Sequence, residues 1–221
     1  MVDRTPSDPA ARKARRQAGR REAILAAARE VLLTDGLAFT MDRVADRADV
    51  SKAGLYYYFD SREAILGALA VVALQREVEV LGRAIVGAPT GVEAIAALLR
   101  AKVELYRDDP DTFRILYLGS PLLGLADARI LAELHPLAEV VVSALENKLV
   151  RDQRLGVLDP DVDARRLASL VAATAQGILA TTLGLGDQGG ALRFELAALC
   201  DEASAALIAR ARGAGRRPPT G

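Results

Sequence analysis

Tryptophan is absent from this chain of 221 residues, and cysteine and histidine occur only once each. A single cysteine cannot form an internal disulfide, which fits a reducing compartment such as the cytoplasm. The one histidine and the one cysteine lie far apart in the sequence, so neither a zinc site nor a nucleophile beside a base is evident, and no pairing of carboxylates is suggested. We therefore expect no metal site, no cofactor and no catalytic activity.

An excess of charge of one sign is also missing, because 29 basic residues balance 29 acidic ones. The net charge therefore gives no argument for a nucleic-acid partner. No run of about 18 uninterrupted apolar residues predicts a membrane-spanning helix. The polar and basic start of the chain does not resemble a signal peptide. We expect a cytoplasmic protein that has no membrane partner.

Helix-forming residues, by contrast, are abundant. Hydrophobic residues make up 51% of the chain, although aromatic residues make up only 4%. Ala, Leu and Arg are frequent and all three favour helices, so the composition predicts an all-α fold. Apolar residues recur at the three- and four-residue spacing of helices along most of the chain, and these stretches together predict about nine helices.

Basic residues are concentrated near the N-terminus. Residues 1–16 contain two prolines and many charges, which predicts a disordered basic arm. Such an arm either meets phosphate groups or is a solvated tail, and the sequence leaves both interpretations open. Six basic residues and no acidic one lie between residues 10 and 21: Arg12, Lys13, Arg15, Arg16, Arg20 and Arg21.

Capping residues and helix breakers predict where the helices begin and end. Gly36 ends the first helix, and Thr40 and Ser51 are good N-caps for two short helices. Asp60 with Glu63 resembles a capping box for a fourth helix, as does Thr90 with Glu93 for the fifth. Pro136 should kink or split the long helix that contains it. The later helices are expected at about 91–107, 126–154, 160–183 and 191–212, with a short helix after Pro110 that contains Phe113, Leu116 and Tyr117.

Two short helices joined by a tight turn, over residues 40–59, have the layout of a helix-turn-helix motif. The second helix of such a motif can enter a DNA major groove about 12 Å wide. Leu55 and Phe59 share one face of this helix and are predicted to anchor it to a small core. Tyr56, Tyr57 and Tyr58 are about 100° apart around the helix, so at least one hydroxyl faces water or an acceptor such as phosphate.

Two cations complete this candidate surface. Lys52 lies in the first turn of the second helix, the part nearest the bases in a helix-turn-helix. Arg62 lies in the first turn of the following helix, where its charge opposes the helix dipole. A phosphate partner would explain that position, although an exposed arginine needs no partner.

This segment resembles the DNA-binding domain of the TetR family of bacterial transcription regulators. The resemblance covers roughly residues 17–77, whereas the rest of the chain matches only in the number and length of its helices. Two residues depart from the family pattern: Asp49 replaces the usual turn glycine, and Gly54 stands where threonine is common. The matching residues are Thr40, Val44, Ala45, Val50, Ser51, Leu55, Tyr56, Tyr58 and Phe59.

The resemblance implies a three-helix DNA-binding domain and a role for individual residues in it. Tyr56, Tyr58 and Arg62 would hold phosphates. Thr40, Arg43, Lys52 and Tyr57 would lie at or near the bases. Ser51 and Gly54 belong to the same predicted DNA-binding surface, where Gly54 permits a closer backbone approach.

By the same resemblance, residues 78–212 form a helical domain for ligand binding and dimerisation, and residues 213–221 a flexible tail. The segment 164–183 is rich in small residues and apolar nearly all round. Together with apolar residues of 194–207 it either builds half of a four-helix dimer interface or fills the core of one protomer. The scarce residues that combine aromatic bulk with a possible ligand contact are Tyr106, Phe113, Tyr117 and His135.

These patterns predict a sequence-specific transcription regulator that binds double-stranded operator DNA. The favoured interpretation is a homodimeric repressor released from a palindromic operator by a small, mostly apolar ligand. The alternatives are a helical small-molecule-binding module without DNA-binding activity and, less favoured, an enzyme. The operator, the effector and the regulated genes cannot be read from the sequence, and neither can the choice between repressor and activator.

Overall fold

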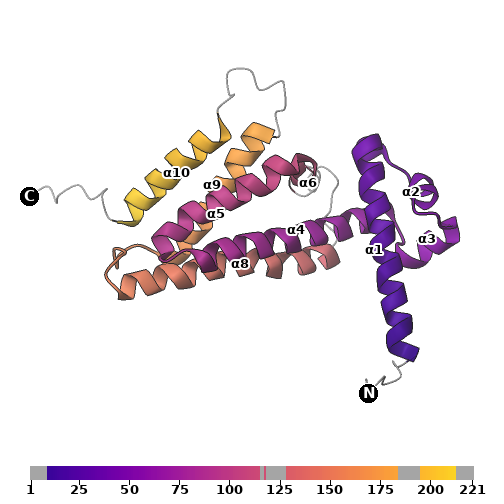
Figure 1. Cartoon of the computed structure of the whole chain (residues 1–221), viewed down its shortest axis with the longest axis horizontal. Coiled ribbons are helices and arrows are strands. Elements are labelled where there is room, and N and C mark those ends of the chain that lie inside the picture. Colours follow the sequence, from indigo (N-terminus) through magenta and orange to yellow (C-terminus); the bar gives the residue numbers. More distant parts are fainter. Residues whose placement is uncertain (1–8, 115–116, 118–127, 184–194, 213–221) are drawn as a thin grey trace, which may run out of the picture. The chain divides into compact units, whose positions relative to one another are not determined.

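The computed structural model describes residues 9–114, 117, 128–183 and 195–212, and it divides between unit 1, up to Leu69, and unit 2, from Ala70. Within these residues the chain forms nine α-helices and one short 3-10 helix, and no strand (Figure 1). The prediction of an all-α fold with about nine helices is confirmed. The boundary between the units falls inside helix α4 (Arg62–Gly87).

Unit 1 contains α1 (Pro9–Asp35), the 3-10 helix Gly36–Ala38, α2 (Met41–Arg47), α3 (Lys52–Tyr58) and the start of α4. Helix α1 packs against α2, and α2 packs against α3. Gly36 has a φ of 61°, the left-handed conformation expected of the residue that ends a helix. The core of the unit is formed by buried side chains from all four helices, including Ile24, Ala28, Phe39, Val44, Leu55, Phe59 and Ile65.

Helix α1 begins at Pro9, earlier than the disordered arm expected for residues 1–16 allows. Proline is tolerated in the first helical turn, where its missing N–H costs no helix hydrogen bond. The residues that follow are mostly Ala, Arg and Lys, which are good helix formers. Residues 9–16 are therefore the first turns of α1, and residues 1–8 lie outside the described part of the chain.

Two helices begin a few residues later than the sequence predicted. Helix α4 is capped by Ser61, whose hydroxyl accepts a hydrogen bond from the backbone N–H of Ala64 at 3.1 Å, and not by Asp60. Helix α9 (Ala164–Leu183) is preceded by Asp163, whose carboxylate accepts from the N–H of Arg166 at 2.9 Å. In both places a better-placed capping side chain follows the predicted one by one to four residues.

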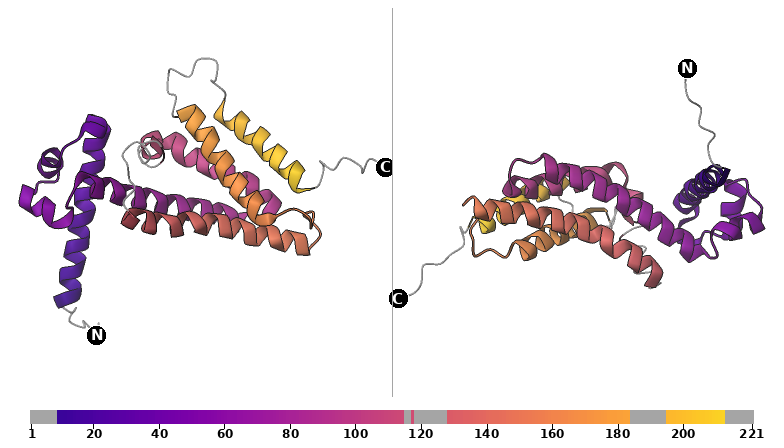
Figure 2. Two further views of the ribbon diagram at one scale, coloured as in Figure 1. Left: turned by 180° about the vertical axis from the view of Figure 1, so that it is seen from behind. Right: turned by 90° about the horizontal axis from the view of Figure 1, so that it is seen from below.

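Unit 2 is a helical bundle around α5 (Gly91–Asp108), which packs against α6 (Pro110–Phe113), α8 (Ala128–Arg154), α9 and α10 (Leu196–Ala211) (Figures 1 and 2). Helix α8 continues through Pro136, so the proline does not split it. The capping box of Thr90 and Glu93 is present with both of its hydrogen bonds. Residues 115–116, 118–127 and 184–194 and the predicted tail 213–221 lie outside the described residues.

Helix α8 holds the junction between the end of α4 and the start of α5. The ammonium of Lys148 donates to the backbone carbonyls of Ile85, Val86 and Ala88 at the C-terminal end of α4. The buried carboxylate of Asp152 accepts from the backbone N–H of Val92, in the first turn of α5, at 3.0 Å. Each charge therefore faces the helix end whose dipole it complements.

Helix α9 is long and apolar enough to cross a membrane by length and composition, a test that core helices of soluble proteins also pass. One side of α9 is buried in the core of unit 2, with Leu167, Val171 and Leu179. The opposite side, which includes Leu170 and Gly177, is exposed within the protomer. Helix α9 therefore has one face in the core of the protomer and an opposite face that is exposed. The sequence had left open whether this helix serves the core or a dimer interface.

Candidate DNA-binding surface and buried polar cluster

The helix-turn-helix over α2 and α3 is held by two side-chain caps. The hydroxyl of Thr40 accepts a hydrogen bond from the N–H of Arg43 at 3.3 Å, and that of Ser51 accepts from the N–H of Gly54 at 3.0 Å. A Cβ on Gly54 would lie 3.1 Å from the Ser51 hydroxyl, so the glycine keeps this cap uncrowded. Both hydroxyls are therefore engaged with their own helices before any partner is bound.

The turn between α2 and α3 contains one residue with a strained backbone conformation, and a side chain of α1 supports it with a hydrogen bond. Asp49, which replaces the glycine usual in the family pattern, has a φ of 51°, in the left-handed region. The guanidinium of Arg20 on α1 donates to the backbone carbonyl of Asp49 at 2.7 Å. This hydrogen bond helps to offset the cost of placing a residue with a Cβ there.

Helix α3 presents tyrosines outward and buries its apolar anchors. Leu55 and Phe59 are buried, which confirms the predicted anchoring face. Tyr57 is 70% exposed and Tyr56 is 45% exposed, whereas Tyr58 is half-buried. The rings of Tyr57 and Tyr58 meet edge to face with centroids 5.0 Å apart. Two hydroxyl-bearing rings therefore face away from the core, where the spacing around the helix required at least one.

The predicted base-reading cations lie in exposed ion pairs. Lys52 Nζ lies 2.8 Å from a carboxylate oxygen of Asp42 on α2, and Arg43 lies 3.0 Å from Asp35. The hydrogen bond to the neighbouring carboxylate raises the pKa of Lys52 and of Arg43. Because exposed ion pairs contribute little stability, both cations can exchange a carboxylate for DNA at small cost.

Arg62, the first residue of α4, takes a different position. Its guanidinium lies over the ring of Phe39, 5.7 Å from the ring centroid, and its Nε is 3.4 Å from Glu63. The nine predicted DNA-binding residues thus lie on α2, α3, their caps and the start of α4. What each would contact on DNA stays a prediction.

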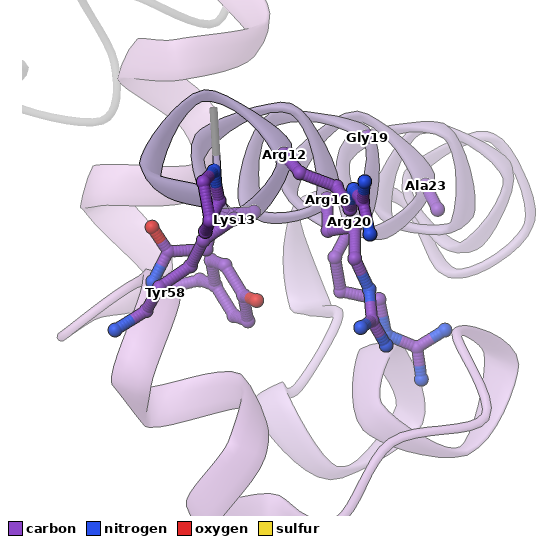
Figure 3. Close-up of a pocket in the computed structure, with 9 residues that line it drawn as sticks. Arg12, Lys13, Arg16, Gly19, Arg20, Ala23 and Tyr58 are labelled. Atoms are coloured by element: carbon purple, nitrogen blue, oxygen red, sulfur yellow. The ribbon is translucent and has the colours of Figure 1, made fainter. Parts of the chain in front are cut away.

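Two side chains of α1, Gln17 and Arg21, attach this helix to α3 and its C-cap Phe59. Gln17 donates to the hydroxyl of Tyr57 at 3.0 Å, and the guanidinium of Arg21 lies 4.9 Å from the centroid of Phe59. Beside them a hollow of about 760 Å³ is lined by α1 and by Tyr58 (Figure 3). No local signal in the sequence indicated these contacts, because they join α1 to residues of α3 and its C-cap that lie far along the chain.

A buried polar cluster lies inside unit 2, where the sequence indicated mainly aromatic residues. Glu77 on α4 and Lys102 on α5 form an ion pair of 2.9 Å, and their side chains are only 5% and 6% exposed. Lys102 also donates to Tyr117 at 3.1 Å and to Gln176 of α9 at 3.2 Å. The hydroxyls of Tyr106 and Tyr117 both donate to the same oxygen of Glu77.

Three of the four predicted ligand-contacting residues meet at this cluster. The rings of Tyr106, Phe113 and Tyr117 lie in mutual contact, with centroids 5.1 to 6.1 Å apart. Burial raises the pKa of both tyrosines, so they act as neutral donors. His135 is exposed on α8, and its part in a ligand site stays a prediction.

The charged members of the cluster were detectable in principle. Glu77 lies between Leu74 and Leu81 on the apolar side of α4, and Lys102 lies between Leu98 and Tyr106 on the apolar side of α5. A charge within an apolar stripe, with an opposite charge in the stripe of the next helix, indicates a buried ion pair. Within the described ranges, no group of three or more His, Cys, Asp and Glu side chains is placed to hold a metal ion.

Unit 1 and unit 2 together define a helix-turn-helix DNA-binding regulator with a second, all-helical unit. Residues 24–69 match the family model of bacterial regulatory proteins of the tetR family. This match covers most of the helix-turn-helix unit, and together with the shared helical fold it agrees with the resemblance to the TetR family that the sequence indicated. A comparison with curated proteins gave no significant match.

Solved structures with this fold span nearly the whole described chain. A protein of unknown function from Rhodococcus sp. RHA1 shares 25% identity with a TM-score of 0.69, over 87% of this chain and 95% of that one. A TetR/AcrR regulator from Thermobifida fusca shares 22%, with a TM-score of 0.69, over 90% and 100%. FadR from Bacillus subtilis, solved in complex with stearoyl-CoA, shares 20%, with a TM-score of 0.68, over 85% and 97%. The last two likenesses show the fold alone.

Proposed function

We propose that this protein is a homodimeric repressor that binds a palindromic operator through α3 and is released by a small, mostly apolar ligand. The main support for DNA binding is the outer face of α3, where Tyr56 and Tyr57 are exposed and Lys52 lies in the first turn. Exposed aromatic hydroxyls and a cation in this part of a helix-turn-helix suit phosphate and base contacts. A module without DNA-binding activity would have no use for them.

The test of this function starts from the DNA, because the operator is unknown. Purified protein should enrich a palindromic sequence from a library of random duplexes. Failure to enrich any sequence, while the protein stays folded, would contradict a sequence-specific regulator. Repressor action is then tested with a reporter whose promoter overlaps the enriched site: expression should fall when the protein is present.

Individual roles on α3 are separable by comparing the enriched operator with a scrambled duplex. Lys52→Ala should weaken operator binding roughly 5- to 150-fold, corresponding to about 1–3 kcal/mol, and scrambled DNA much less. Tyr58→Phe, a phosphate contact by our assignment, should weaken both duplexes equally. Anisotropy titrations measure both affinities, and Arg100→Ala on unit 2 is the matched control. Equal losses on both duplexes for Lys52→Ala would make Lys52 a backbone contact.

The proposed dimer rests on the outward faces of α9 and α10. On α9, Leu170 is 43% exposed, and Ala173 and Gly177 are exposed beside it. The exposed positions of α10 are largely alanines, whereas Leu207, for which the sequence left open a place in the dimer interface or in the core, is buried in the core of unit 2. Small apolar residues on two adjacent helices allow close approach of the same pair from a second copy.

Leu170→Glu should convert the dimer to a monomer, because it places a charge in an interface expected to bury about 2,000 Å². Leu155→Glu is the matched control, since Leu155 is 64% exposed and lies outside α9 and α10. Sedimentation velocity at micromolar concentration reads the outcome. A wild-type protein that sediments only as a monomer would overturn the proposed dimer.

The proposed effector contacts the aromatic residues beside the buried ion pair. The aromatic rings of Tyr106 and Phe113 favour a mostly apolar molecule, and the Glu77–Lys102 pair adds polar groups that the sequence did not lead us to expect. FadR from Bacillus subtilis, which shares this fold, was solved in complex with stearoyl-CoA. Stearoyl-CoA is therefore the first probe: if it binds this protein equally with and without saturating operator, it is not an inducer.

A further inference from the structure

We propose that the first turns of α1 form a second DNA-contacting element, which binds backbone phosphates beside the groove entered by α3. This inference rests on the proposed DNA-binding function and adds a surface that lies outside the helix-turn-helix. Its occupant is the phosphate backbone of the same duplex. Three features support this element: the attachment of α1 to the helix-turn-helix, the positive charge of α1, and the tyrosine of α3 that lines the hollow beside it.

Three contacts fix α1 against the helix-turn-helix. Gln17 donates to the Tyr57 hydroxyl on α3, Arg20 donates to the carbonyl of Asp49 in the turn, and Arg21 lies over the ring of Phe59. These residues occupy two consecutive turns of one continuous helix that begins at Pro9. The helix therefore carries the residues before Gln17 at a defined position relative to α3, as a disordered arm would not.

The hollow beside α1 is strongly basic. Among the described residues that line it, none is acidic, and the basic ones are Arg12, Lys13, Arg16 and Arg20. Arg12, Arg16 and Arg20 are four residues apart and so lie on one face of α1, over about 12 Å of helix at 1.5 Å per residue. Like charges at this spacing destabilise a helix, and a polyanion along that face would compensate them.

Tyr58 identifies the polyanion as the DNA that α3 binds. Its side chain comes from α3 and lines the same hollow as Lys13 and Arg16, as Figure 3 shows. A strand whose phosphate contacts Tyr58 would therefore continue past the basic face of α1. Duplex DNA carries one charge per about 1.7 Å of its axis, so a 12 Å row of cations can face several phosphates.

The test removes three charges from this face and leaves Arg20, which braces the turn. In the full-length protein we would make R12Q, K13Q and R16Q together, because glutamine keeps the helix propensity. The matched control is R83Q, R151Q and R154Q, which removes three exposed charges from unit 2. Anisotropy titrations between about 50 and 200 mM salt use the enriched operator and a scrambled 30-base-pair duplex.

Each protomer of the proposed dimer loses three cations, so we expect the slope of log affinity against log salt to become shallower by about five, at about 0.9 per phosphate contact, with at least a roughly tenfold loss of affinity at the lower salt on both duplexes. The ratio of operator to scrambled affinity should stay close to that of the wild type, because phosphate contacts carry no sequence information. The control variant should keep the wild-type slope.

Each contrary result has a separate meaning. A wild-type slope in the α1 variant would overturn the second contact element and leave the proposed function intact. An equal loss in the control variant would also overturn it, because the effect would then come from net charge. A wild-type protein that binds neither duplex would overturn the proposed function and this inference together.

Discussion

Replacing Lys102 with methionine should lower the free energy of unfolding by about 3–5 kcal/mol. The substitution removes the cation from a buried pair and leaves the Glu77 carboxylate among apolar side chains with only tyrosine hydroxyls as partners. An unfolded chain returns that carboxylate to water, so the folded state alone bears the cost. Denaturant unfolding followed by circular dichroism, at one fixed protein concentration, measures the change.

A double variant separates the lost charge pair from lost packing. Glu77→Gln combined with Lys102→Met removes both charges and keeps an amide oxygen for the hydroxyls of Tyr106 and Tyr117, so it should recover most of the stability. Arg100→Met is the matched control on the same helix, because its ion pair with Asp201 is exposed. A loss below about 1 kcal/mol for Lys102→Met would contradict a desolvated pair.

Gly91→Ala should destabilise unit 2 by about 3 kcal/mol, the upper end of the usual range for overpacking. A Cβ on Gly91 would lie 2.8 Å from the backbone nitrogen of Leu149 and from the carbonyl carbon of Lys148. These are backbone atoms of α8, so no flexible side chain can move aside. The start of α5 would have to shift, and the hydrogen bond from Val92 to Asp152 would lengthen with it.

Gly82→Ala is the control for this steric argument. Gly82 lies inside α4, and a Cβ there meets nothing within 4 Å. Alanine has the higher helix propensity, so this substitution should raise stability by up to about 1 kcal/mol. Thermal unfolding of both variants compares them directly. If Gly91→Ala matched Gly82→Ala, the close approach of α5 to α8 would not exist in solution.

Local signals in the sequence predicted most of the DNA-binding unit. Thr40 and Ser51 cap their helices through bonds to residues three positions on, and Gly36 needs only its own left-handed conformation. Such features depend on neighbouring residues, so they are visible in a sequence. The misplaced cap at Asp60 is of the same kind, since Ser61 next to it competes for the same role.

Features that depend on distant partners were not predictable in this way. Glu77 and Lys102 are 25 positions apart, and their pairing requires knowledge of which faces of α4 and α5 meet. In the sequence, Lys148 and Asp152 look like ordinary charged residues of a long helix. Their roles depend on the packing of α8 against the end of α4 and the start of α5, which the sequence does not give. The N-terminal turns of α1 are stabilised by contacts with α3, which no local pattern contains.

The buried ion pair also restricts how this sequence can diverge. A single substitution at either Glu77 or Lys102 passes through a chain with one uncompensated interior charge, and such a chain is selected against. Related sequences should therefore change the two positions together, to an apolar or a reversed pair, or retain both. Covariation between these two positions among related sequences would then be evidence that α4 and α5 are in contact in those proteins as well.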